Sequence, residues 1–166
     1  MTNRWAVFWI AVLVAADAAT KAFIHSTMHE GGSIVVIPGF LSLTYVRNPG
    51  GAFGMLAGLA DPWRQAFFVV VACATVGFLL WLWGRVPVAQ RFQRIAIVLV
   101  IAGAAGNLID RFAYGEVVDF LDFYLGSAHW PAFNIADTCI SVGAAGLVLA
   151  SFVHSPDRQH SSASPR

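Results

Sequence analysis

The sequence predicts an all-α membrane protein, in which four transmembrane helices carry a small β-rich platform and a short amphipathic helix in the first outer loop. The composition supports this fold class, because 58% of the 166 residues are hydrophobic and 11% are charged, with a mean hydropathy of +0.68. This balance is typical of membrane proteins. The apolar residues also concentrate in four long stretches. We therefore expect one membrane domain over residues 1–154 and a disordered cytoplasmic tail over 155–166.

The four predicted spans cover about residues 5–23, 66–83, 95–109 and 135–153. At about 1.5 Å per residue, the second span is about 27 Å long, which is close to the ~30 Å hydrocarbon core of a bilayer. The third span is too short to cross the core unless its polar end is buried in protein. Most of the tryptophans lie near the predicted ends, where interfacial aromatic side chains are common.

The basic residues predict the orientation of the spans. They lie before the first span, between the second and third, and after the fourth: Arg4, Arg85, Arg91, Arg94, Arg158 and Arg166. Cytoplasmic segments are enriched in such residues, so both termini should be cytoplasmic. The net charge of +1 gives no reason to expect nucleic-acid binding.

The first stretch has an alternative interpretation as a cleaved signal peptide. Arg4 precedes its apolar run, and Ala16-Asp17-Ala18 resembles a small-residue cleavage site. Cleavage would leave three spans and would place the two basic segments that follow on opposite sides of the membrane. The charge pattern favours four spans. Cys73 and Cys139 lie alone in separate spans and are expected to be small core residues rather than a redox pair.

The outer segment over about residues 30–62 is predicted to form the platform. Residues 33–46 are rich in β-branched and aromatic side chains and are interrupted by Pro38-Gly39, which predicts two short strands around a turn. Residues 55–60 follow a turn-rich stretch and are expected to form a brief helix at the membrane surface.

Polar side chains inside the spans gather at the outer ends of three helices. A charge at the centre of a span costs about 2.5 to 3.5 kcal/mol on insertion scales, so such residues need a reason to be there. Residues three and four positions apart share one face of a helix. The three groups are Asp17, Thr20 and Lys21; Asn107, Asp110 and Arg111; and Asn134, Asp137, Thr138 and Ser141.

One interpretation is that these residues only stabilise the bundle, with Asp17 paired to Lys21 and Asp110 paired to Arg111. The small residues at 103–106 and 143–146 would then let the helices approach closely. This explains each residue singly but not the cluster, because Asp119 and Asp137 flank a short loop at the same outer end without a cation each.

Two close carboxylates without a nucleophilic triad are typical of aspartic peptidases. Like charges about 3 Å apart cannot both ionise, so the pair shares one proton, and one member activates water while the other polarises the carbonyl. A metal site is the alternative use of paired acids, but the five histidines, of which only His129 lies near the loop, show no ligand spacing. We expect no metal and no cofactor. Asp122 competes with Asp119 for the catalytic role, although Asp122 and Glu116 are more simply solvated charges.

Five motifs, in order, resemble the signatures of lipoprotein signal peptidase, also called signal peptidase II. They are Asp17-Ala-Ala-Thr-Lys21, Asn48-Pro-Gly-Gly-Ala-Phe53, Gly106-Asn-Leu-Ile-Asp-Arg111, Val117-Val-Asp-Phe120 and Phe133-Asn-Ile-Ala-Asp137. The resemblance implies a bacterial inner-membrane aspartic endopeptidase with four spans. It also implies cleavage of prolipoproteins just before a diacylglyceryl-modified cysteine.

By this resemblance Asp119 and Asp137 match the catalytic dyad. The remaining motif residues would position substrate or support the dyad, with Asn48 and Arg111 contacting substrate. This set comprises Asp17, Lys21, Asn48, Asn107, Asp110, Arg111 and Asn134. Gly51 departs from the family, which often has Ala there.

The expected partners are a lipidated prolipoprotein and membrane lipid, and the chain is expected to be a monomer. The substrate would enter sideways between helices and reach a site near the outer face, under a platform and a lid. Two other function classes remain open. A small proton-coupled transporter or channel would use the intramembrane acids as a relay, and a non-enzymatic assembly subunit would use them as polar contacts.

Overall fold

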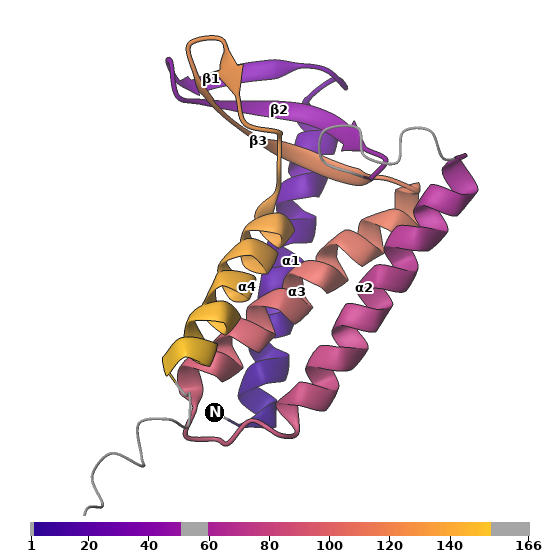
Figure 1. The fold of residues 1–166 in the computed structure, drawn as a ribbon. Coiled ribbons are helices and arrows are strands. Elements are labelled where there is room, and N and C mark those ends of the chain that lie inside the picture. Colours follow the sequence, from indigo (N-terminus) through magenta and orange to yellow (C-terminus); the bar gives the residue numbers. More distant parts are fainter. Residues whose placement is uncertain (1, 51–59, 154–166) are drawn as a thin grey trace, which may run out of the picture.

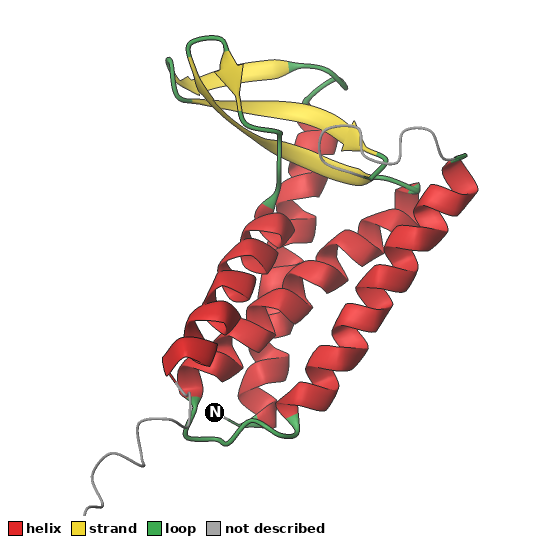
Figure 2. Cartoon of the chain, viewed as in Figure 1, coloured by secondary structure: helices red, strands yellow, loops and turns green. Residues whose placement is uncertain are grey.

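The computed structural model describes residues 2–50 and 60–153, and it consists of a helical bundle with a sheet over one end (Figures 1 and 2). The helices are α1 (Asn3–Thr27), α2 (Asp61–Trp83), α3 (Arg91–Tyr114) and α4 (Ile135–Val153). All four are long and apolar enough to cross a membrane. The expectation of four helices long and apolar enough to span a membrane is therefore confirmed.

Three helices extend further than the hydropathy predicted, and α1 covers Asn3–Thr27 where residues 5–23 were expected. α2 begins at Asp61 rather than residue 66, and Pro62 lies in its first turn, where a missing N–H is tolerated. α3 continues to Tyr114 and ends at Gly115, whose φ of 78° suits glycine at a helix end. Hydropathy detects only the apolar part of a helix, whereas these polar end turns are helical because their backbone groups are satisfied.

α3 is the central helix of the bundle. In the most apolar 18-residue stretch of α3, 61% of the residues are buried inside the protein, whereas in that of α2 only 6% are buried. Contact with α4 depends on small residues, because a Cβ at Gly103 would lie 2.2 Å from the Ala136 carbonyl oxygen and one at Gly143 would lie 2.6 Å from Val100 Cγ2. The expected close approach at these glycines is present.

The four-stranded antiparallel sheet has the order β1-β2-β3-β4. β1 (Ser33–Ile37) and β2 (Leu41–Asn48) form the hairpin predicted around Pro38-Gly39. β3 (Val117–Leu125) and β4 (Ala128–His129) come from the connection between α3 and α4, which was expected to be a short loop. That expectation was wrong, because the β-branched and aromatic residues of 117–125 pair with β2.

The pairing of β2 with β3 contains an irregularity that matters for the site. Leu43 pairs with Leu121, whereas Val46 pairs with Asp119, so β2 carries one extra residue between these two pairs. Such a bulge re-aims the side chains that follow it. The sheet rests on the end of α1, where Ile24 packs with Tyr45 and Val118.

Two expectations fall on residues 51–59 and 154–166, which lie outside the described residues. The first is the brief helix over residues 55–60, of which only residue 60 is described, and the second is the disordered tail. α1 is an integral helix of the bundle, which favours the four-span interpretation over a cleaved signal peptide.

Candidate active site

The two predicted catalytic carboxylates converge where the sheet meets the bundle. Asp119 lies on β3 and is 2% exposed, and Asp137 lies in the first turn of α4. Asn134 bridges them, because its Nδ2 donates to Asp119 Oδ1 at 2.7 Å and its backbone N–H donates to Asp137 Oδ2 at 3.3 Å. The two acids thus approach each other across the β3–β4 hairpin, not across the short loop that we expected.

The start of α4 fixes the position of Asp137. Asn134 Oδ1 accepts the backbone N–H of Asp137 at 2.9 Å, and Asp137 Oδ2 accepts the backbone N–H of Asn134. This reciprocal pair is a capping box, in which both side chains satisfy free N–H groups at a helix N-terminus. Asp137 is therefore held by the same contacts that begin its helix.

A second asparagine, Asn107 on α3, holds the other oxygen of Asp137. Asn107 Nδ2 donates to Asp137 Oδ1 at 2.7 Å, while its Oδ1 accepts from Lys21 Nζ at 3.1 Å. An ammonium group can only donate, so Lys21 sets the orientation of this amide. The Asn107 NH₂ group must then point at Asp137.

A third asparagine, Asn48 at the end of β2, acts on Asp119 in the same way. Asn48 Nδ2 donates to Asp119 Oδ2 at 2.9 Å, and Asn48 Oδ1 accepts the backbone N–H of Gly50 at 2.9 Å. Each of the four carboxylate oxygens of the dyad therefore accepts one hydrogen bond from an asparagine. Each asparagine is oriented by a group that can only donate.

Behind the dyad, Lys21 joins two buried acids. Its Nζ lies 2.6 Å from Asp17 Oδ2 and 2.8 Å from Asp110 Oδ2, and each of the three residues is at most 5% exposed. Asp17 Oδ1 accepts the N–H of Ala136 at 2.9 Å, and Asp110 Oδ2 accepts the N–H of Val118 at 3.3 Å. The network thereby ties the start of α4 and the start of β3 to α1 and α3.

The pairing of Asp110 with Arg111 that we expected was wrong. Neighbouring residues on a helix point in different directions, so Asp110 faces α1 and meets Lys21. The pairing of Asp17 with Lys21 is confirmed. Thr20 does not join the network, because its hydroxyl donates to carbonyl oxygens of its own helix.

Arg111 lies beside a cavity of about 290 Å³ between α2, α3 and α4. Its Nη1 donates to the Asn107 carbonyl oxygen at 3.1 Å, and its guanidinium lies over the Phe68 ring at 5.0 Å. Asp137 and Asn107 also line this cavity, and the remaining wall is mainly apolar: Phe68, Val71, Ala72, Thr75, Val100, Ala104 and Ile140. A polar end with Asp137, Asn107 and Arg111 thus adjoins an apolar wall between the helices.

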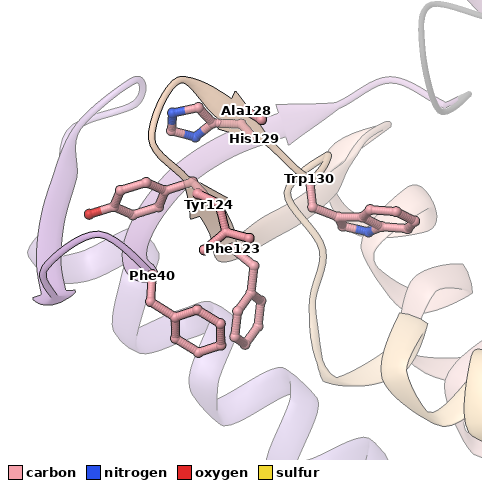
Figure 3. Close-up of a pocket in the computed structure, with 7 residues that line it drawn as sticks. Phe40, Phe123, Tyr124, Ala128, His129 and Trp130 are labelled. Carbon is pink, nitrogen blue, oxygen red and sulfur yellow. The ribbon is translucent and has the colours of Figure 1, made fainter.

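Asp122, the local competitor of Asp119, is directed elsewhere. Residues three apart on a strand point to opposite faces, so Asp122 faces away from Asp119. The Asp122 carboxylate instead contacts His129, with Oδ1 at 3.0 Å from Nδ1. His129 lines an aromatic pocket together with Phe40 and Trp130 (Figure 3), and the volume of this pocket is about 310 Å³. Among the described residues, no three His, Cys, Asp or Glu side chains group as a metal site would require.

Gln65 and Phe68 on α2 are two residues of the site that the sequence did not predict. Gln65 Nε2 donates to the Arg111 carbonyl oxygen at 2.9 Å, and Phe68 lies under the guanidinium of Arg111. Gln65 is a polar residue at the edge of an apolar span, which is a signal that could have identified it. Phe68 carries no such signal, because it is one apolar residue among many.

Burial changes the proton affinity of Asp119. Desolvation is the largest effect and raises the pKa of Asp119 to about 7, and the charge of Asp137 adds to this increase. The hydrogen bonds from Asn48 and Asn134 act in the opposite direction. Asp119 is therefore suited to hold a proton near neutral pH, which an ordinary aspartate is not.

Comparison with known proteins gives a consistent result. The family described as Signal peptidase (SPase) II matches residues 9–153. The lipoprotein signal peptidase of Desulforapulum autotrophicum is 48% identical over 132 residues, covering 80% of this chain and 82% of that protein. That of Syntrophus aciditrophicus is 46% identical over 140 residues, covering 83% of this chain and 86% of that protein.

The fold is likewise similar to a solved structure. A bacterial membrane enzyme with 33% sequence identity superposes with a TM-score of 0.82 and covers 98% of this chain and 96% of that enzyme. The resemblance indicated by the five motifs is thereby confirmed. This multi-pass bacterial membrane protein belongs to the signal peptidase II family and is a peptidase.

Proposed function

We propose that this protein is an aspartic endopeptidase that removes signal peptides from diacylglyceryl-modified prolipoproteins, cleaving before the lipidated cysteine. The relatives named lipoprotein signal peptidase support the substrate class. The observation that carries the catalytic assignment is the pair of carboxylates at Asp119 and Asp137, whose four oxygens are each held by an oriented asparagine.

The dyad works with one shared proton. Asp119 is buried and keeps that proton, because desolvation raises its pKa. Asp137 lines the cavity and acts as the base, which removes a proton from a water molecule as the water attacks the scissile carbonyl. Asp119 donates its proton to the carbonyl oxygen. The tetrahedral intermediate then collapses, and the leaving amine takes the proton from Asp137 while Asp119 regains its own.

The cavity suits an apolar substrate segment next to a polar scissile bond. Its wall along α2, α3 and α4 is mainly apolar, and its polar end carries Asp137, Asn107 and Arg111. A signal peptide entering sideways from the bilayer would keep its apolar part in this channel and its lipid chains in the membrane. Arg111 lines the polar end of this cavity and would bind the peptide near the cleavage site, whereas Asn48 acts on Asp119.

The site is proposed to lie near the outer face of the bacterial inner membrane, in a monomer with both termini in the cytoplasm. In Figure 1 the sheet and the α2–α3 connection lie at opposite ends of the bundle. That connection carries Arg85 and Arg91 without an acid, which is the pattern of a cytoplasmic loop.

A transporter would need polar groups along a complete path. Beyond Asn107, Arg111 and Asp137, the only polar side chain among the lining residues of the cavity is Thr75. The buried acids and amides of the network therefore lie at one end of the described bundle, and the buried Arg94 at the other end bonds to the Val86 carbonyl oxygen, so the polar groups form no continuous path through the cavity. An assembly subunit without catalytic activity would not require amide groups that are oriented toward two carboxylates.

The test is cleavage of a lipidated prolipoprotein by purified protein in detergent. Asp119→Asn and Asp137→Asn should each lower the rate at least ~10³-fold, as removal of a catalytic group does in other hydrolases. The matched control is Asp122→Asn, which alters another acid on β3 and should keep the rate within about twofold. Full activity in folded Asp119→Asn protein, or loss in Asp122→Asn instead, would refute the assignment.

A further inference from the structure

The hydroxyl of Tyr45 lies at the centre of a buried contact between β2 and α1. Tyr45 is 3% exposed. Its Oη lies 2.6 Å from His25 Nδ1 in the last turns of α1, and it accepts from Arg47 Nε at 3.1 Å. Nothing in the proposed chemistry uses this residue, although Asn48 follows it by three positions.

The proton positions in this contact are determined by Arg47. Its Nε–H can only donate, so Tyr45 Oη is the acceptor of that bond. The Tyr45 hydroxyl can then donate its hydrogen to His25 Nδ1, in the tautomer of His25 that has no hydrogen on Nδ1. One hydroxyl thereby links the end of α1 to two residues of β2.

The backbone of Tyr45 is also anchored outside the β2–β3 ladder. Its N–H donates to the Gly32 carbonyl oxygen at 3.0 Å, and its carbonyl oxygen accepts from the Gly31 N–H at 2.8 Å. Tyr45 lies between the two register positions, Leu43 and Val46, that enclose the extra residue of β2. Tyr45 is thus part of the bulge, and its backbone is bonded to Gly31 and Gly32 rather than to β3.

The bulge decides which side chain of β2 reaches the dyad. After it, Val46 pairs with Asp119 and Asn48 pairs with Val117, so Asn48 lies diagonally across from Asp119 on the same face. A shift of one residue turns every following side chain to the opposite face of a sheet. Asn48 would then point away from Asp119 and Arg47 would take its place.

We propose that Tyr45 is a positioning residue of the active site, which acts through Asn48 by pinning the β2 bulge with its hydroxyl. This inference rests on the proposed function of the dyad. His25 and Arg47 are the two partners through which the hydroxyl acts. The ring of Tyr45 has a separate role, because it packs in a core cluster with Ile24 and Phe120.

The test is a double-mutant cycle between Tyr45→Phe and Asn48→Ala, measured as prolipoprotein cleavage by the full-length purified enzyme. Tyr45→Phe keeps the packed ring and removes only the hydroxyl. It should lower kcat about 5- to 10-fold, whereas Asn48→Ala should lower it about 100-fold. The double variant should match Asn48→Ala, because the hydroxyl has nothing left to position.

The pH profile gives a readout that a purely structural role would not move. The Asn48 hydrogen bond lowers the pKa of Asp119, so its loss should move the alkaline limb of activity to higher pH. Tyr45→Phe should shift the limb in the same direction by a smaller amount. The double variant should show no shift beyond that of Asn48→Ala.

The matched control is Tyr124→Phe, which removes the hydroxyl that accepts the Gly39 N–H at 3.3 Å elsewhere on the sheet. It should keep the activity and leave the effect of Asn48→Ala unchanged. If Tyr45→Phe does not fold, Arg47→Met removes the other side of the contact from a partly exposed position. It should show the same lack of additivity with Asn48→Ala.

Two outcomes separate this inference from the proposed function. If Asp119→Asn retains activity, the proposed function itself fails. If Asp119→Asn is inactive but the effects of Tyr45→Phe and Asn48→Ala multiply to about 500- to 1,000-fold, the dyad remains and the positioning role of Tyr45 is refuted. An unchanged pH limb in Tyr45→Phe would refute it as well.

Discussion

Replacement of Lys21 by Met should destabilise the protein strongly. Lys21 is the only lysine in the sequence, and its buried ammonium lies within 2.8 Å of carboxylate oxygens of both Asp17 and Asp110. Methionine has a similar length and fills the same apolar path, so packing changes little. The variant instead leaves two buried carboxylates without their cation.

The size of the effect follows from that geometry. Removing one partner of a buried ion pair destabilises a protein by about 3 to 5 kcal/mol, because the remaining charge stays desolvated. With about 2 to 4 °C of melting temperature per kcal/mol for a chain of this size, the loss is about 6 to 20 °C. Asn107 Oδ1 also loses one of its two donors and keeps only Asn134 Nδ2 at 3.2 Å, so its amide is held less firmly toward Asp137 and activity should fall in the protein that still folds.

Cysteine labelling during heating in detergent measures this change. Cys139 is 6% exposed and lies close after Asp137 on α4, so a thiol dye reports opening of the helix bundle beside the site. Cys73 is exposed, and a Cys73→Ala background removes its signal. The matched control is Arg64→Met, which breaks the surface ion pair with Asp61 and should change the melting temperature by less than about 2 °C.

A second variant tests the cause of the instability. Asp17→Asn in the Lys21→Met background removes one unpaired charge and keeps an oxygen for the Ala136 N–H. It should recover part of the lost melting temperature. Two results would refute the reasoning: a Lys21→Met protein as stable as the parent, or a double variant that is less stable than Lys21→Met alone.

Two further predictions follow from the geometry of the site. Burial raises the pKa of Asp119 to about 7, so kcat/KM should fall as the pH rises through about 7 and the dyad loses its shared proton. A fall in kcat/KM near the ordinary aspartate pKa of about 4 would contradict this. Gly103→Ala should lower cleavage and stability, with about 1 to 3 kcal/mol of overpacking, because its Cβ would meet the Ala136 carbonyl oxygen next to Asp137. Gly77→Ala on α2, where a Cβ meets nothing within 4 Å, is the matched control and should leave both unchanged.

The sequence predicted those features that depend on local composition. Four apolar stretches are sufficient to locate four helices, and the Pro38-Gly39 break between β-branched residues locates the first hairpin. The candidate site residues were found from intramembrane polarity and from the five motifs. Both signals can be read without knowing which residues touch.

The sequence could not predict contacts that join distant segments. The strand at 117–125 pairs with β2, and Asp17 on α1 binds the first turn of α4, 119 positions away. Pairings of this kind depend on the whole fold and leave no periodic pattern. For the same reason Asp110 was assigned to its neighbour Arg111, when its partner is Lys21 on another helix.

The charge balance of the site connects the fold to the proposed chemistry. Four acids, Asp17, Asp110, Asp119 and Asp137, share this region with two cations, Lys21 and Arg111. With all six side chains charged, their formal total is −2, and one added proton brings it to −1. Burial penalises such a net charge, so it favours binding of that proton. Burial raises the pKa of Asp119 to about 7, so we expect the added proton on the dyad, beside Asp17 and Asp110, which are bonded to Lys21 and to backbone N–H groups. A shortage of buried cations thus favours the monoprotonated pair of carboxylates that aspartic peptidase chemistry requires.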